Sequence, residues 1–125
     1  MSSINKIILV GNVGKQPEVR ALQQSGNEVA TFTLATSERW LDKSTGEKRE
    51  ATEWHSIVIF NKHLVSFVKQ YVNKGDKLYI EGKLKTRKWQ DKNGADKYST
   101  EIVLENYQGM LVSLKNKNNN EANSL

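Results

Sequence analysis

Aromatic and cationic side chains share one face of a predicted strand from Leu78 to Gln90. Successive side chains of a strand point to opposite faces, so the apolar Leu78 and Ile80 fall on the even-numbered face. The odd-numbered face consists of Tyr79, Glu81, Lys83, Lys85, Arg87 and Trp89. A flat ring beside cations suits a stacked nucleic-acid base and its phosphate. The alternative is a solvated edge strand whose Trp covers a neighbouring loop.

The segment from Thr52 to Phe60 repeats this arrangement. Trp54 and Phe60 share one face, and the opposite face holds His55, Ile57 and Ile59. The two rings would lie about 20 Å apart along an extended strand, a spacing that allows them to stack separate bases. The alternative is that Trp54 and Phe60 lie in the core while the isoleucine face lies at an interface.

Trp40 is the third Trp of the chain, and its orientation is left open by parity. It shares the parity of the apolar Phe32 and Leu34, which is typical of a core face. Only a bend at the entrance to the polar loop at residues 42–47 would turn its ring outward.

Other reactive groups are too sparse to predict catalysis. His55 and His63 have no acidic or cysteine neighbour at metal-ligand spacing, and the chain has no cysteine. The stretch from Gly11 to Gln16 has two residues between its glycines where a phosphate-binding loop needs four. No local motif supplies an activated nucleophile or a pair of acids. We therefore expect a protein that is not an enzyme, with no metal and no cofactor.

The charge of the chain favours an anionic partner. Nineteen Lys and Arg residues against fourteen Asp and Glu residues give a formal net charge of +5. Residues 74–97 hold eight of these cations and four acids, so we expect the anion site to include this segment. The longest apolar run, Ile7 to Val10, is far too short for a membrane span, and the first residues do not resemble a targeting signal. A soluble protein without membrane association is expected.

The elements that must position these residues are mostly strands. Period-two patterns and turn residues predict strands at 4–10, 19–22, 29–37, 52–60, 78–90 and 98–104, with an Asn93-Gly94 hairpin turn and a short final strand at 109–114. Apolar residues at helical spacing from Leu64 to Val72 predict one helix, with Asn61 as its N-cap and Gly75 as its C′ residue.

This order of elements predicts an all-β domain. A chain of 125 residues suits one domain, and a helix between the third and fourth strands suits a five-stranded OB-fold barrel. We assign this domain to residues 1–114. Residues 115–125 are rich in Asn and Lys and poor in apolar side chains, so we expect a disordered polar tail there.

Several motifs in the same order resemble the bacterial-type single-stranded DNA-binding protein family. They are Asn5 to Gly14, Pro17 to Arg20, Thr33 to Glu38, Thr52 to His55, Lys74 to Asp76, Tyr79 to Gly82, and Thr86 to Trp89. The resemblance covers roughly residues 4–112. It implies an OB fold, a homotetramer, and cooperative, sequence-tolerant coating of single-stranded DNA in replication, recombination and repair. It also implies a cytoplasmic, nucleoid-associated location, with an organellar form as the alternative.

The resemblance also implies roles for individual residues. It places Trp40, Trp54, Phe60 and Trp89 at base-stacking positions, which resolves the orientation of Trp40. It places Lys43, Lys62, Lys74, Arg87 and Lys88 at positions that contact the DNA backbone, and the parity of the strand adds Lys85 to them. His55 falls at a subunit contact. Because a barrel this small cannot place all its apolar surface in one core, we expect part of the His55, Ile57 and Ile59 face to be buried between subunits.

Two departures from the family pattern affect these expectations. Ser56 stands where many relatives have Arg, which removes one phosphate contact. The segment from Lys115 to Leu125 lacks the Gly- and Pro-rich linker and the acidic tip that recruit replication and repair proteins. Two other functions are the alternatives: an OB-fold module for protein assembly, and an OB-fold protein that binds RNA.

Overall fold

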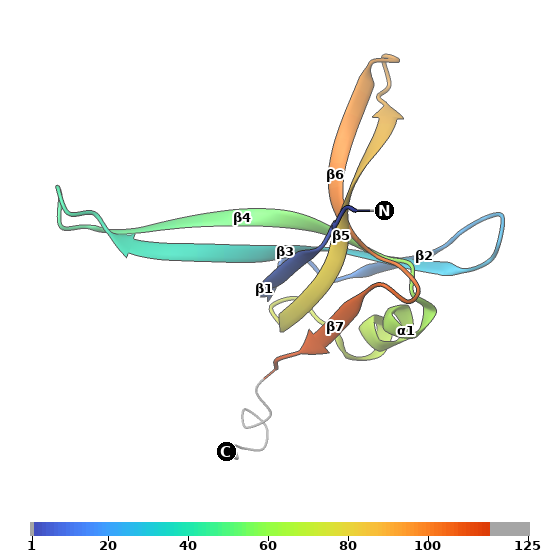
Figure 1. The fold of residues 1–125 in the computed structure, drawn as a ribbon, viewed down its shortest axis with the longest axis horizontal. Coiled ribbons are helices and arrows are strands. Elements are labelled where there is room, and N and C mark those ends of the chain that lie inside the picture. The colour runs from blue at the N-terminus through green and yellow to red at the C-terminus, as the bar shows by residue number, and fades with distance from the viewer. Residues whose placement is uncertain (1, 116–125) are drawn as a thin grey trace.

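The chain forms strands that close a barrel, and two pairs of these strands continue beyond it as hairpins. The computed structural model describes residues 2–115. The elements are β1 (Ile7–Val13), β2 (Glu18–Ala21), β3 (Glu28–Leu41), β4 (Lys48–Ile59), α1 (Lys62–Tyr71), β5 (Lys77–Gln90), β6 (Asp96–Leu104) and β7 (Met110–Ser113). Figure 1 shows α1 below the β2–β3 hairpin, and the long β3–β4 and β5–β6 hairpins project from the barrel in different directions.

Five strands close the barrel. Their order is β1-β3-β4-β6-β5, and the pairing of β5 with β1 completes the ring, while β2 pairs with β3 and β7 with β5. β4 and β6 pair in parallel over three residues, from Ile57 opposite Ile102 to Ile59 opposite Leu104. The helix lies between the third and fourth barrel strands, β4 and β5. The predicted five-stranded OB-type barrel is therefore confirmed.

The core of the barrel consists of the apolar face of each strand, covered at one end by α1. On β4, Ile57 and Ile59 are buried, and on β5 so are Leu78 and Ile80. The helix adds Val65 and Val68 to the same cluster. The expectation that Ile57 and Ile59 contribute to a subunit contact is therefore wrong, because their side chains fill the interior of their own barrel.

The helix begins where the sequence predicts and ends earlier. The Asn61 side chain accepts hydrogen bonds from the backbone N–H groups of His63 and Leu64 at 3.0 and 3.2 Å, as expected of an N-cap. The chain leaves the helix at Val72, whose backbone is extended and whose side chain is buried in the core. Gly75 has a φ of +92° but lies beyond the helix end, so its assignment as the C′ residue is wrong.

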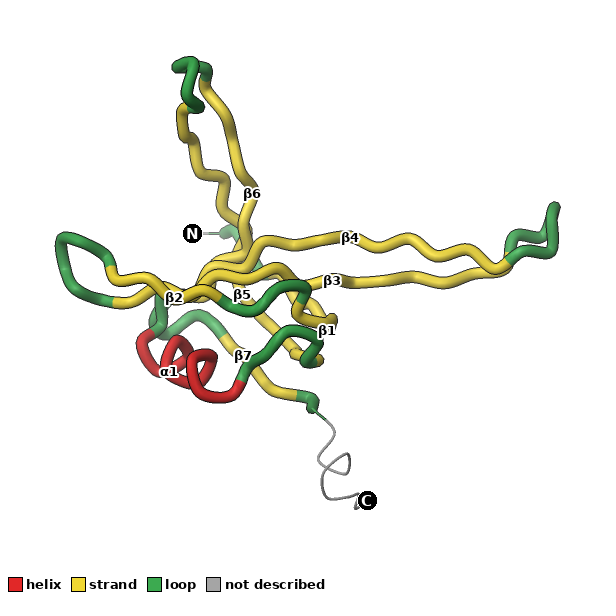
Figure 2. The backbone as a smooth tube through the Cα atoms, turned by 180° about the vertical axis from the view of Figure 1, so that it is seen from behind, coloured by secondary structure: helices red, strands yellow, loops and turns green. Residues whose placement is uncertain are grey.

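Two hairpins extend beyond the barrel, and the one formed by β3 and β4 is longer than the predicted strands at 29–37 and 52–60. β3 continues to Leu41 and β4 begins at Lys48, with ladder pairing from Ala30 opposite Ile59 out to Leu41 opposite Lys48. β5 and β6 pair out to Gln90 opposite Asp96, so β5 ends where predicted and β6 begins two residues before the predicted start. Figure 2 shows both hairpins as two-stranded ribbons whose outer ends lie away from the barrel and the helix. The barrel therefore presents two long arms to solvent.

β1 also continues past residue 10, where the predicted first strand ends, and reaches Val13. A Cβ atom at Gly11 would lie 2.2 Å from the backbone oxygen of Ala35 and 3.2 Å from Cγ of Leu34. The close approach of β1 to β3 therefore needs glycine at this position.

We expect Gly11→Ala to destabilise the fold by about 1–3 kcal/mol, because the added methyl group would overlap the backbone of β3. A matched control is Gly46→Asn, at a turn with a φ of +76° and open space around the Cα atom. Asn tolerates a left-handed backbone, so this variant is expected to change stability little. Urea unfolding of both variants measures the difference, and equal stability of Gly11→Ala and the parent protein would contradict the close approach.

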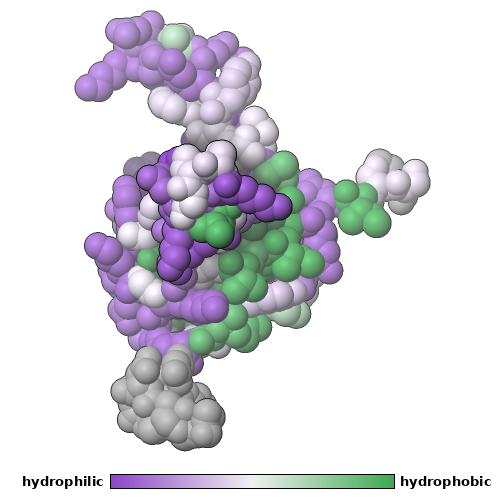
Figure 3. Space-filling view, turned by 90° about the vertical axis from the view of Figure 1, so that its left-hand side faces the viewer, coloured by the Kyte–Doolittle hydropathy of each residue, from purple (hydrophilic) through white to green (hydrophobic). Residues whose placement is uncertain are grey.

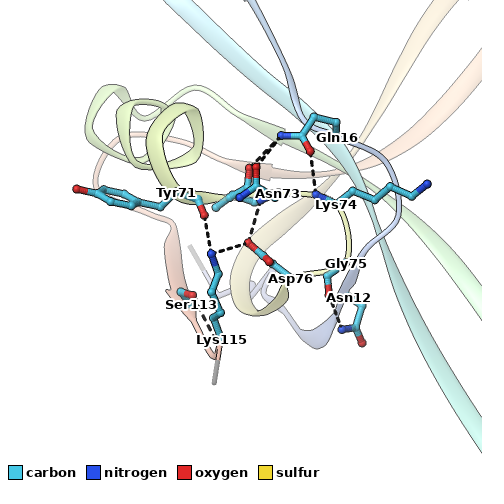
Figure 4. A network of polar contacts seen from close by, with 10 residues as sticks. Asn12, Gln16, Tyr71, Asn73, Lys74, Gly75, Asp76, Ser113 and Lys115 are labelled. Carbon is cyan, nitrogen blue, oxygen red and sulfur yellow. Dashed lines mark hydrogen bonds and ion pairs between the residues drawn. The ribbon is translucent and has the colours of Figure 1, made fainter. Parts of the chain in front are cut away.

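Lys115, the first residue of the predicted polar tail, is held by two contacts. Lys115 Nζ donates to the backbone oxygen of Tyr71 at 3.1 Å and lies 3.2 Å from Asp76 Oδ2 (Figure 4). The rest of the predicted polar tail, residues 116–125, lies outside the described residues. Within residues 2–115, no helix is long and apolar enough to cross a membrane, and no three acidic or histidine side chains gather as metal ligands.

Candidate nucleic-acid interface

A surface trough runs along the outer face of β4. It consists of two neighbouring hollows of about 220 and 550 Å³ that share Thr31, Val58 and Glu101. The first hollow is also lined by Lys15, Thr33 and Ser56, and the second by Arg20, Phe60 and Arg87. We call these residues together the β4 trough. It offers apolar, hydroxyl and cationic groups along one line.

Trp54 lies beside the Lys15 end of the β4 trough and exposes 63% of its surface. A Cβ atom at Gly14 would lie 2.5 Å from the Trp54 ring and 2.6 Å from Oγ1 of Thr33, so the ring lies against the glycine backbone. Phe60 directly follows β4, lines the trough and is 40% exposed. The alternative that Trp54 and Phe60 lie in the core is therefore wrong, and both rings are available to a ligand.

The positive charge of the β4 trough comes from opposite walls. Arg20 lies on β2 and Arg87 on β5, and both line the hollow that contains Phe60. Arg87 Nη2 lies 3.1 Å from Oε2 of Glu101, whose side chain is only 15% exposed. The alternation along the strand from Leu78 to Gln90 predicted Arg87 as a site residue. It did not predict Arg20 or Glu101, because these residues reach the trough only through the pairing of β2 with β3 and of β5 with β6.

Trp40 and Lys43 lie on the β3–β4 arm, away from the barrel. β3 runs without interruption past Trp40, which pairs with Arg49 and keeps the parity of Phe32 and Leu34. The predicted bend is therefore absent. Trp40 is nevertheless 49% exposed, because the arm extends beyond the barrel and nothing among the described residues covers that face. Lys43 lies in the loop at the tip of the arm.

The tip of the arm is held together by the neighbours of Lys43. The backbone N–H and the hydroxyl of Ser44 donate to Asp42 Oδ1 at 2.9 and 2.7 Å. These bonds lower the pKa of the Asp42 carboxyl group below its ordinary value. Arg49 Nε lies 3.3 Å from the other Asp42 oxygen. The loop that contains Lys43 is therefore fixed by hydrogen bonds and an ion pair.

Trp89 and Lys88 lie on the second arm, formed by β5 and β6. The Trp89 indole N–H donates to Ser99 Oγ at 2.9 Å, which fixes the ring against the hairpin while 41% of its surface stays exposed. Lys88 Nζ lies 3.4 Å from Asp96 Oδ2, and both side chains are half exposed. Because this ion pair is solvated, it contributes little to stability, and Lys88 can exchange its partner for a phosphate.

Lys85 lies on β5 nearer the barrel than Lys88, and a carboxylate lies close to it. Glu105 lies 3.1 Å from Lys85 Nζ and 2.8 Å from Lys83 Nζ. Hydrogen bonds from Lys83 and then Lys85 lower the pKa of the Glu105 carboxyl group. The excess charge of residues 74–97 is therefore partly balanced by Glu101 and Glu105 on and just after β6.

The remaining predicted residues lie at three other places. Lys62 opens α1 two residues after Phe60. Lys74 lies in the α1–β5 loop, where its backbone N–H donates to Gln16 Oε1 at 3.0 Å and its side chain extends away from the polar network (Figure 4). His55 is half-buried on β4, and its Nε2 atom shares a hydrogen bond of 2.9 Å with Thr36 Oγ1. The structure thus brings Phe60 and Arg87 into the β4 trough with Trp54 beside it, places Trp40, Lys43, Lys88 and Trp89 on the two arms, and leaves Lys62 and Lys74 apart from both.

Known proteins are similar to this chain in sequence and in fold. A model of the "single-strand binding protein family" matches residues 4–110. A "single-stranded DNA-binding protein" from Rickettsia typhi is 53% identical over 118 residues, which are 94% of this chain and 77% of that protein. A protein of the same name from Rhizobium meliloti is 55% identical over 112 residues, which are 90% of this chain and 64% of that protein. A solved structure titled "Plasmodium falciparum SSB complex with ssDNA" superposes with a TM-score of 0.81 at 40% identity, and the match covers 92% of this chain and 98% of that one. The chain belongs to the single-strand binding protein family.

Proposed function

We propose that this protein binds single-stranded DNA along the β4 trough and coats it during replication, recombination and repair. The observation that supports this most directly is the pair of exposed rings, Trp54 and Phe60, on one face of β4 beside the trough cations Arg20 and Arg87. Every base has a flat face for stacking, while each phosphate offers a negative charge to the arginines. Relatives in the same family and the similar solved complex support the same ligand.

Binding of this kind tolerates any sequence. Stacking energy depends on the face of a base and not on its hydrogen-bonding edge, and phosphate contacts contain no sequence information. Trp40 with Lys43 and Trp89 with Lys88 offer a second and a third contact on the two arms. A strand that reaches all three places must bend around the barrel, which single-stranded DNA does readily. We therefore assign base stacking to Trp40, Trp54, Phe60 and Trp89.

The backbone of the DNA is assigned to the basic residues Lys43, Lys62, Lys74, Lys85, Arg87 and Lys88. Arg87 lines the β4 trough, and Lys62 lies two residues after Phe60. The protein acts by this binding alone, without catalysis, a metal or a cofactor, and its location is at the nucleoid. The proposed role, coating of single-stranded DNA, therefore depends on stacking and phosphate contacts.

Competition between ligands tests the proposed function against its alternatives. A labelled oligodeoxythymidylate is bound to the protein and displaced by DNA single strands, RNA single strands or duplex DNA of the same length. We expect unlabelled single-stranded DNA to compete best and duplex DNA to compete poorly, because paired bases cannot stack on Trp54. Preference for RNA, or no binding of any strand, would replace the proposal with RNA binding or protein assembly, respectively.

We further propose a homotetramer, whose contacts use apolar surface outside the barrel core. The outer faces of β1 and β7 expose Ile8, Val10, Met110 and Val112, and β5 lies between these strands. Figure 3 shows apolar side chains gathered on one flank of the molecule. An exposed apolar surface of this kind is typical of a protein interface. His55 is assigned to a second subunit contact.

The dependence of affinity on salt is expected to report the phosphate contacts. For single-stranded DNA the logarithm of the binding constant should fall linearly with the logarithm of salt concentration, with a slope of about −0.7 per phosphate contacted. Lys88→Ala should reduce the magnitude of that slope by a fraction to about one unit without introducing a sequence preference. Lys77→Ala removes the same charge at the opposite end of β5 and is expected to leave the slope almost unchanged. Equal slopes for Lys88→Ala and the parent protein would contradict the role of Lys88.

A further inference from the structure

A third hollow continues the β4 trough beyond Phe60. It has a volume of about 790 Å³, and Phe60 and Ala21 line both this hollow and the adjoining part of the trough. Its other walls come from the start of α1, with Lys62 and His63, and from the β6–β7 loop, with Tyr107. We call this hollow the end groove. A strand leaving Phe60 in this direction enters it directly.

Tyr107 is placed in the end groove by the backbone of the barrel. The Phe60 N–H donates to the backbone oxygen of Leu104 at 2.8 Å, which ties the end of β4 to the end of β6. A turn follows at once, closed by a hydrogen bond of 3.2 Å from the Gln108 N–H to the Glu105 oxygen. The Tyr107 side chain therefore projects close to the end of β4, although Phe60 and Tyr107 are far apart in sequence.

The conformation of Tyr107 is costly for the fold. Its φ is +69°, the only positive φ of a residue other than glycine within residues 2–115, and its side chain is 100% exposed. A bulky residue in the left-handed region is strained, and glycine or asparagine would fit the same turn without that strain. An aromatic ring held in water by a strained backbone gains nothing from packing. This combination points to a ligand for the ring.

The charges around the end groove favour an anion. The first turn of α1 begins with Lys62 and His63 and contains no acidic residue, so the positive end of the helix dipole is not neutralised there. Lys62 forms no ion pair with any residue of the described range 2–115. Glu28 also lines the groove, but its carboxylate lies 3.0 Å from Lys69 Nζ. A phosphate in this groove therefore meets cations on the helix side.

We propose that the DNA path continues through the end groove, where Tyr107 stacks a base beyond the one on Phe60 and Lys62 and His63 contact the phosphate between them. This inference rests on the proposed function, because it extends the same strand along the same line of β4. It adds Tyr107 and His63 to the binding residues. It also predicts that oligonucleotides long enough to pass Phe60 gain affinity from Tyr107.

The variant Tyr107→Gly separates binding from folding. Glycine removes the ring and adopts a φ of +69° without strain, so the stability of the protein should stay equal or increase. Affinity for a long oligodeoxythymidylate should fall about 5- to 150-fold, the range expected for loss of one stacked base. Tyr107→Phe keeps the ring and is expected to bind like the parent protein. As an independent readout, photocrosslinking to an oligonucleotide containing 5-iododeoxyuridine should label the peptide that contains Tyr107.

The same titrations include Trp54→Ala, so that two kinds of failure can be distinguished. One outcome is that Trp54→Ala binds weakly, Tyr107→Gly binds like the parent protein, and no crosslink forms at Tyr107. This outcome would overturn the end-groove path and leave the proposed function standing. Unchanged binding by both variants would overturn the proposed function itself. Dissociation of the Tyr107→Gly protein into smaller species during sedimentation would assign the ring to a subunit contact and also overturn this inference.

Discussion

Replacement of Trp54 and Phe60 together by alanine is expected to weaken binding of single-stranded DNA by about 2–6 kcal/mol. Each stacked base contributes about 1–3 kcal/mol, and residues well separated along β4 should contribute almost additively. The physical reason is that alanine leaves the phosphate contacts of the β4 trough in place but removes the flat surfaces that hold the bases. Equilibrium titration with an oligodeoxythymidylate at fixed salt concentration measures this loss.

Conservative variants distinguish stacking from structure. Trp54→Phe retains an aromatic face against Gly14 and should recover most of the affinity that Trp54→Ala loses. Both rings are exposed outside the buried core, so the double alanine variant should remain folded, which urea unfolding can verify. A folded double variant with the affinity of the parent protein would refute stacking on β4.

Loss of Arg87 is expected to have an effect larger than that of any other single cation. Arg87→Ala removes a phosphate contact and also leaves Glu101 without its partner inside the β4 trough. The free carboxylate, which is only 15% exposed, would then repel the phosphate that Arg87 attracted. We expect a loss of about 2–3 kcal/mol, on the scale of a broken charge-assisted hydrogen bond with an unpaired acid left behind.

A double-mutant cycle isolates the contribution of Glu101. Glu101→Gln alone should bind DNA as well as or better than the parent protein, because the trough loses a negative charge. Adding Glu101→Gln to Arg87→Ala should restore part of the lost affinity. Identical losses for Arg87→Ala with and without Glu101→Gln would show that the carboxylate does not act on the ligand.

The sequence predicts the barrel and the trough face well because both depend on burial. The alternation from Thr52 to Phe60 separates Ile57 and Ile59 in the core from Trp54 and Phe60 outside, as a strand with one buried face must. The Asn61 cap and the turn at Gly94 are local, and the structure contains both, with Gly94 at a φ of +81°. Local hydrogen bonds and period-two patterns need no knowledge of distant neighbours.

The length of the β3–β4 arm could not be predicted, for the same reason, whereas β5 ends at Gln90 as predicted. Beyond the barrel neither face of a two-stranded ribbon is buried, so Arg39 to Leu41 and Lys48 to Ala51 have no apolar alternation although they pair as strands. Trp40 is exposed because the strand is this long. It does not need the bend that its parity with Phe32 and Leu34 had suggested. The family resemblance predicted that the Trp40 ring points outward, but only the structure gives the physical reason.

Pairings between distant segments account for the other differences. Contacts of Arg87 with Glu101 and of Lys85 with Glu105 depend on the β5–β6 register and the turn that follows it. The early end of α1 depends on burial of Val72 in the barrel core. Tyr107 has no signal in a single sequence, because a Tyr in a polar turn looks the same whether or not the backbone has a positive φ.

The central claim, that bases stack on Trp54 beside the β4 trough, is tested most directly by proteins with one Trp each. The chain has three Trp residues, so substitution of two of them by Phe gives proteins that contain only Trp40, Trp54 or Trp89. Saturation with an oligodeoxythymidylate should strongly quench the fluorescence of the protein that contains only Trp54. Unchanged Trp54 fluorescence, in a protein that still binds the oligonucleotide, would contradict a DNA path along β4.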